Sequence, residues 1–257
     1  MSHHDVDASP LSDLSVTLTE LGGAPRPAMD RAHELGLRWV QLSATQAGLR
    51  PRELDASARR DLLATLRRRE LGLSGLDVWL PPDHFLDPAT VDRALGAATG
   101  AVGLAADLGR VPVSINLPRV GEEAPQVAAL SEVIDALTTI ADRQGVAIAD
   151  HTLPAQERSG IGMGIDPAAC LAIDTDPVSL VTAAGGNLIS ARLCDLLRTG
   201  MRGPIGSFTE GRLDVAAYRA TLSVVGYDRP VIVDARQWSS PLPGITTTIR
   251  AWESAGI

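Results

Sequence analysis

Short apolar runs alternate with longer amphipathic stretches along this chain. Eight runs have the length and composition of buried strands, at residues 14–18, 38–43, 73–80, 111–118, 145–151, 160–166, 188–195 and 230–235. Runs of this kind, separated by helical segments, are typical of a parallel sheet. The pattern therefore predicts an α/β protein.

The segments between the runs have helical periodicity, and five of them end at a glycine. They span residues 27–36, 56–72, 87–109, 125–145 and 214–226. Glycine readily adopts the left-handed conformation that follows a last helical turn. The segment 87–109 opens with Asp87 and Pro88, which predicts an N-cap followed by a first-turn proline.

Strand–helix units repeated eight times in 257 residues match the size of a closed parallel barrel. An open, doubly wound sheet is the rival, but "TLTELGGAPRP" after the first run is not the phosphate-binding pattern G-x-G-x-x-G. We therefore predict a flexible tail over residues 1–13, a single (β/α)8 TIM barrel over residues 14–257, and no nucleotide cofactor.

Composition narrows the functional classes. The net charge of −8 argues against a nucleic-acid partner, which needs a basic face. All 23 basic residues are arginine, so no lysine can form a Schiff base. Cys170 and Cys194 lie in apolar contexts and are expected in the core. Neither a signal peptide nor a membrane-spanning run is evident, so we expect a cytoplasmic protein without a membrane partner.

Polar residues recur where the predicted strands end. In a parallel barrel these ends open at one mouth, where catalytic groups gather. The residues are Asn116, Asp150, His151, Asp166, Arg192, Asp195, Asp234 and Arg236. Any one of them could be an ordinary cap or loop residue, as Asp166 before Pro167 illustrates. Their recurrence on neighbouring strands favours a functional site.

Several motifs resemble one family. They are "AHELGLRWVQL", "GVAIADH", "IGMGIDP" and "GYDRPVIVD". Together they are similar to the sugar phosphate isomerase/epimerase superfamily, which has the xylose isomerase-like barrel. The resemblance implies isomerisation or epimerisation of a sugar or sugar phosphate by proton transfer next to a carbonyl.

The resemblance also implies a divalent metal, commonly Mn, Mg, Co or Zn. Family members hold it with a Glu on strand five, an Asp on strand six, a His on strand seven and a Glu on strand eight. The matching positions here are His151 (or Asp150), Asp166, Arg192 and Asp234. Arg192 cannot ligate a metal, because its guanidinium has no free lone pair and stays protonated.

Three hypotheses follow. In the first, Arg192 replaces the metal-binding histidine, pairs with Asp166 and Asp234, and these three residues are catalytic in a weak or altered isomerase. In the second, His151, Asp166 and Asp234 still bind a metal and Arg192 points away. In the third, the barrel has lost metal-dependent isomerase activity and only binds a small ligand. A DNA-repair endonuclease of this barrel type is set aside, because histidines are few and the charge is acidic.

Other residues are expected to bind substrate. At the strand ends these are Asn116, Asp150, Asp195 and Arg236, while Trp79 and Trp238 are candidates either for apolar walls or for packing. The loop 198–212 offers Arg198, Arg202 and Arg212 to a phosphate or carboxylate. The expected partners are a small sugar or anionic polyol, and a second copy of the chain in a homodimer.

Overall fold

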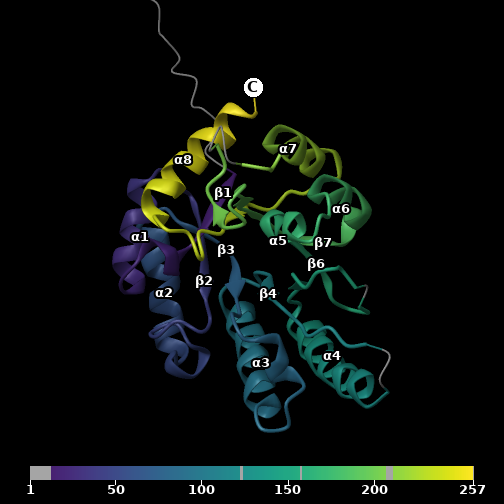
Figure 1. Cartoon of the computed structure of the whole chain (residues 1–257). Coiled ribbons are helices and arrows are strands. Elements are labelled where there is room, and N and C mark those ends of the chain that lie inside the picture. The colour runs from purple at the N-terminus through teal and green to yellow at the C-terminus, as the bar shows by residue number, and fades with distance from the viewer. Residues whose placement is uncertain (1–12, 122–123, 157, 207–210, 257) are drawn as a thin grey trace, which may run out of the picture.

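The eight apolar runs form the strands of a closed parallel barrel in the computed structural model (Figure 1). They are β1 (Leu14–Thr17), β2 (Trp39–Ser43), β3 (Gly72–Asp77), β4 (Val113–Ile115), β5 (Ile148–Asp150), β6 (Gly162–Ile165), β7 (Leu188–Leu193) and β10 (Val231–Val233). The ring closes where β1 pairs with β10, Leu14 lying opposite Val231. This confirms the predicted (β/α)8 barrel.

The structure describes residues 13–121, 124–156, 158–206 and 211–256. Apart from Asp13, the predicted tail falls outside these ranges. Asp13 itself accepts a backbone hydrogen bond from Val231, which continues the pairing of β1 with β10.

Helices surround the barrel on its outside (Figure 1). Five of them were predicted: α1 (Pro25–Glu34), α2 (Ala56–Arg68), α3 (Val91–Asp107), α4 (Ala124–Gln144) and α7 (Val215–Val224). The third starts later than expected, because the Asp87 side chain caps a turn at Ala89 before the helix begins. Among the described residues, no helix has both the length and the apolar character needed to cross a membrane.

Three helices were missed by the sequence analysis: α5 (Pro167–Ala172), α6 (Pro177–Ala184) and α8 (Pro241–Ser254). The first two are too short to establish a helical period. The last contains three threonines, two prolines and one glycine, all weak helix formers. The remaining elements are the 3-10 turns η1 (Leu18–Leu21), η2 (Pro51–Glu53), η3 (Pro82–Phe85) and η4 (Gly185–Asn187), and a hairpin of β8 (Asp195–Leu196) and β9 (Arg202–Gly203).

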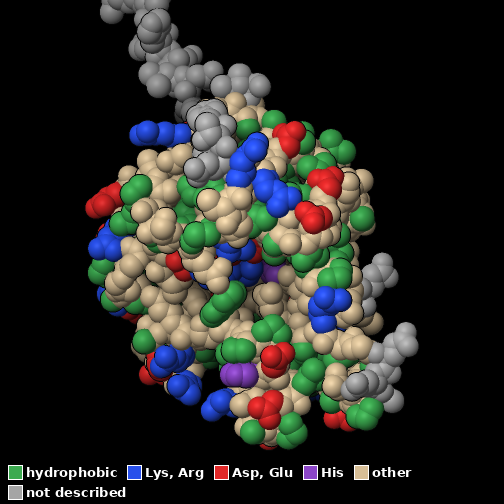
Figure 2. All heavy atoms as spheres, in the orientation of Figure 1, with side chains coloured by type: hydrophobic (Ala, Val, Ile, Leu, Met, Phe, Trp, Pro, Cys, Tyr) green, Lys and Arg blue, Asp and Glu red, His purple; other side chains and the backbone are tan. Residues whose placement is uncertain are grey.

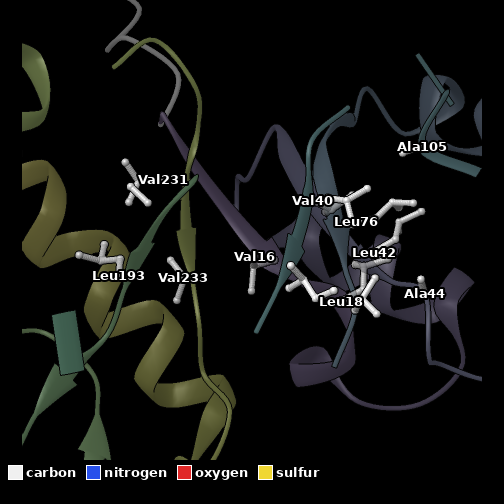
Figure 3. Packing of buried hydrophobic residues seen from close by; sticks show 14 of the residues in the cluster. Val16, Leu18, Val40, Leu42, Ala44, Leu76, Ala105, Leu193, Val231 and Val233 are labelled. Carbon is white, nitrogen blue, oxygen red and sulfur yellow. The ribbon is translucent and has the colours of Figure 1, made fainter. Parts of the chain in front are cut away.

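The strands alternate between an apolar and a polar face. Val16, Val40, Leu42 and Leu76 belong to the hydrophobic core cluster (Figure 3). The intervening residues hydrogen-bond to one another: they are Ser15, Thr17, Gln41, Ser74, Ser114 and Ser190. Three of these bonds join strands that are not neighbours, so they cross the barrel interior: Ser15 to Ser74 at 2.6 Å, Gln41 to Ser114 at 3.4 Å and Ser114 to Ser190 at 3.3 Å. This interior is therefore polar, unlike the branched apolar packing common in such barrels.

His151, just after β5, completes this polar interior. Its Nε2 lies 3.3 Å from the Ser114 hydroxyl. Its ring occupies the space beside Gly164 of β6, where an added Cβ would come within 2.4 Å of ring atoms. Only glycine at this position leaves room for the imidazole.

Gly164→Ala tests this packing. We expect the variant to lose about 1–3 kcal/mol of unfolding free energy, because the extra methyl overpacks the site. Gly103→Ala on α3 is the control, since its Cβ would meet nothing within 4 Å. This control should be neutral or more stable by up to about 1 kcal/mol. Denaturant unfolding followed by circular dichroism measures both, and equal stability of the two variants would contradict the placement of His151.

Candidate functional site

Three carboxylates and three guanidinium groups interlock at the carboxyl ends of the strands. We call this set the arginine–aspartate network. Its members are Asp77, Asp166, Asp234, Arg192, Arg202 and Arg236. Figure 2 shows acidic, basic and histidine side chains gathered around a hollow near the middle of the face it presents. Because the charges are equal in number, the network is formally neutral.

Arg192 lies at the centre of the network. It extends from β7, and its side chain is only 3% exposed. Its Nη2 donates to Asp77 at 3.0 Å, and its Nη1 to Asp166 at 3.4 Å. Its Nε lies 3.5 Å from a carboxylate oxygen of Asp234. The first hypothesis expected Arg192 to pair with Asp166 and Asp234, and both contacts are present.

The other two arginines close the network from the rim. Arg202, on β9, donates to Asp166 at 3.0 Å and to Asp234 at 3.1 Å. Arg236, just after β10, forms a bidentate pair with Asp234 at 2.7 Å for both bonds and reaches Asp77 at 3.0 Å. Burial opposes ionisation of Asp234, but Arg192, Arg236 and Arg202 outweigh it and hold the pKa of that carboxyl below its usual range.

These contacts determine whether the carboxylates at the mouth are available to bind a divalent metal. Each carboxylate of the network already faces at least two guanidinium groups. In the part of the chain that the structure describes, no three His, Cys, Asp or Glu side chains converge on one point where an ion could sit. The side chains at the barrel mouth therefore do not fit the metal that the family resemblance implies.

His151 lies buried close to the network. Burial lowers the pKa of its imidazole well below the usual value, and the nearby Arg192 and Arg236 lower it further. The ring is therefore neutral at pH 7. The two cysteines are equally unreactive, since burial raises the pKa of Cys170 and of Cys194 to about 12.

The structure places the other acidic candidates outside the network. Asp150 is paired with Arg158 at 3.0 Å and accepts backbone N–H bonds from Leu117 and Thr152, so it holds the loops after β4 and β5. Asp195 accepts the backbone N–H groups of Arg212 and Leu213, both at 2.9 Å.

Of the remaining polar candidates, only Arg202 joins the network. Asn116 follows β4 and is half-buried. Of the loop arginines, Arg212 pairs with Asp174 at 3.2 Å and Arg198 is exposed, while Arg202 belongs to the network. Residues 207–210 of the same loop lie outside the described ranges.

The two candidate tryptophans have different surroundings. Trp238 is buried and donates its indole N–H to the Cys194 sulfur at 3.2 Å. Trp79 is 51% exposed, and the Arg236 guanidinium stacks over it at 4.3 Å from the ring centroid. Trp79 is therefore the one of the two that offers an aromatic face to a ligand.

A cavity of about 370 Å³ adjoins the network, and Trp79 and Arg236 line it. Its other lining residues are Thr19, Glu20, Ser43, Thr45, Gln46, Asp77 and Gln237. Gln237 has a left-handed backbone with φ of +65°, a strained conformation that often marks functional sites. A larger cavity of about 980 Å³ opens among Trp39, α7 and α8, at the opposite end of the barrel and away from the network.

Sequence reasoning missed two acidic residues of this mouth, as well as the uncharged polar residues that line the cavity. Asp77 ends β3 just as Asp166 and Asp234 follow β6 and β10, so a lone carboxylate closing an apolar run was the available signal. Glu20 lies in η1, and no sequence pattern of this kind pointed to it. Burial raises the pKa of Glu20, and Asp234 and Asp77 add to the rise.

Comparisons with known proteins identify the class of fold. No protein-family model matches the chain, and no curated protein matches it in sequence. A xylose isomerase domain protein from Planctomyces limnophilus matches with 17% identity and a TM-score of 0.72, over 95% of this chain and 99% of that one. An L-ribulose 3-epimerase matches with 16% identity and a TM-score of 0.72, over 95% of each chain.

A D-tagatose 3-epimerase-like protein is similar as well, with 11% identity and a TM-score of 0.73 over 95% of this chain and 98% of that one. The chain therefore has the xylose isomerase-like barrel fold, which confirms the fold implied by its motifs. Identities this low establish the fold alone.

The variant Arg192→Ala tests how far the stability of the protein depends on this arginine. We expect a loss of about 3–5 kcal/mol of unfolding free energy, because three buried carboxylates lose a shared partner. Arg26→Ala is the control: its ion pair with Asp61 is exposed and should contribute about 1 kcal/mol or less. Equal losses in denaturant unfolding would contradict the assigned contacts.

The variant Asp234→Asn tests the pairing of Asp234 with the arginines, through the pH dependence of the unfolding free energy. The pKa of Asp234 is lowered in the folded state, so its ionised form stabilises the fold above the unfolded value of about 3.9. That stability is lost as the pH falls below about 4. We expect the difference in unfolding free energy between wild type and variant to be largest at pH 7 and to shrink below pH 4. A difference independent of pH would contradict the pairing.

Proposed function

We propose that this barrel binds a small hydroxyl-rich ligand, a sugar or an anionic polyol, at its carboxyl-end mouth, without metal-dependent proton transfer. One observation carries the proposal: the arginine–aspartate network occupies the carboxylates that a metal or a proton-transfer mechanism would use. Of the three hypotheses drawn from the sequence, this favours the ligand-binding barrel.

The cavity supports recognition of a sugar. Its volume of about 370 Å³ is in the range of small-molecule sites. Hydroxyl groups of Thr19, Ser43 and Thr45 and the amide of Gln237 line it, and they can exchange hydrogen bonds with ligand hydroxyls. The exposed face of Trp79 suits the apolar face of a sugar ring.

The network supports binding more than base catalysis. A general base works best when its pKa lies near the operating pH and it can reach the substrate proton. Asp234 is buried and has a lowered pKa, and Asp166 accepts hydrogen bonds from two arginines. Carboxylates held in this way are suited to forming a rigid wall of a binding site, and less suited to accepting a proton from a substrate.

An isomerase or epimerase remains the second candidate. The observation in its favour is that the similar structures covering 95% of this chain include an L-ribulose 3-epimerase and a D-tagatose 3-epimerase-like protein. Incubation with ketoses in D2O, with and without Mn²⁺, separates the two proposals. Deuterium at the carbon next to the carbonyl would support the isomerase, and its absence would support the binding barrel.

Titration calorimetry with D-fructose, D-tagatose and L-ribulose tests binding directly. We expect at least one ketose to bind equally well with and without EDTA. Trp79→Ala should weaken that binding by about tenfold, the value of one aromatic contact. Trp39→Ala, at the opposite end of the barrel, is the control and should leave affinity unchanged. Binding that EDTA abolishes, or no binding of any ketose, would contradict the proposal.

A further inference from the structure

Glu20 differs from the other carboxylates of the mouth. It lines the 370 Å³ cavity from η1, directly after β1, and is partly exposed there. Among the described residues it has no arginine partner, and the one hydrogen bond it accepts comes from the Thr19 hydroxyl at 3.1 Å. Asp77, the other acid of the cavity wall, is bound by both Arg192 and Arg236.

This difference sets the charge that a ligand would meet. The three arginines and three aspartates of the network cancel formally, so with an ionised Glu20 these seven groups carry one net negative charge. The charged groups that act on Glu20 are Asp234, Asp77 and Arg236. Arg236 is the single cation among the described residues of the cavity wall, and two aspartates already hold it, so it gives an anion little net attraction.

We infer that Glu20 is the specificity-determining carboxylate of this cavity, which selects uncharged ketoses or polyols and rejects their phosphates. The inference rests on the proposed function and narrows it, because of the two ligand classes named there it selects the uncharged sugar over the anionic polyol. An ionised carboxylate accepts strong hydrogen bonds from ligand hydroxyls, as many as two to its two oxygens. The same charge repels a phosphate or carboxylate of the ligand.

The assignment makes binding depend on pH. Burial and the neighbouring aspartates raise the pKa of Glu20, so it is protonated at a less acidic pH than an ordinary glutamate. A protonated carboxyl accepts fewer hydrogen bonds from the ligand. Affinity for an uncharged ketose should therefore fall as the pH is lowered through the pKa of Glu20, and reach a plateau above it.

Titration calorimetry on the full chain tests the inference, with D-tagatose and D-tagatose 6-phosphate as probes between pH 4 and pH 8. The wild type should bind the free ketose at least tenfold more tightly than the phosphate at pH 7. Glu20→Gln keeps the shape but removes the charge. It should weaken binding of the free ketose by about tenfold or more, the value of a charged hydrogen bond, and flatten the pH profile.

Two further variants complete the test. Glu20→Asp keeps the charge and should retain the pH dependence and the preference for the free ketose. Glu34→Gln, on the exposed surface of α1, should behave as the wild type. The inference is overturned when Glu20→Gln keeps the wild-type preference and pH profile, or when the wild type binds the phosphate more tightly. Failure of every ketose to bind the wild type would instead overturn the proposed function itself.

Discussion

A buried guanidinium inside a ring of strands is the constraint on which the rest of this mouth depends. Removing a charge from water costs several kcal/mol, so Arg192 can stay at 3% exposure only with carboxylates around it. Asp77 and Asp166 each bond to it, and Asp234 lies beside it. Each carboxylate in turn needs more positive charge than Arg192 alone supplies, which Arg202 and Arg236 provide. The six groups therefore fix one another's positions.

The barrel interior is polar, like the mouth that contains Arg192. Ordinary barrels of this type fill their interior with branched apolar side chains. Here Thr17, Gln41, Ser114 and Ser190 form a hydrogen-bonded series across the interior, and His151 joins it at Ser114. Polar groups buried together need partners, so the series must stay complete. The same alternation that turns apolar residues toward the helices turns these polar residues, and then Arg192, inward.

A guanidinium and a metal ion give a site different abilities. Both neutralise carboxylates, but only the metal accepts a ligand's oxygen into a coordination bond. Arg192 can donate hydrogen bonds, and its two terminal nitrogens already donate to Asp166 and Asp77, while its Nε lies beside Asp234 without a hydrogen-bond partner among the described residues. Under the proposed function, an arginine in place of a metal makes this part of the mouth a rigid wall. In the proposed function the adjoining cavity, lined by Trp79 and Glu20, is the part of the mouth that meets a ligand.

The sequence by itself determined the eight strands, five of the helices and the strand ends at which charge collects. Local periodicity and caps carry that information, because they depend on neighbours in the chain. It also placed Arg192 near Asp166 and Asp234, since parallel strand ends share one mouth. Only the tertiary structure decided that Asp77, 115 positions from Arg192, is a direct partner. It alone placed Trp79 at the cavity and Trp238 in the core. Among the described residues it also left Glu20 without an arginine bonded to it. Side-chain partners across a barrel depend on where distant loops return, which no local pattern encodes.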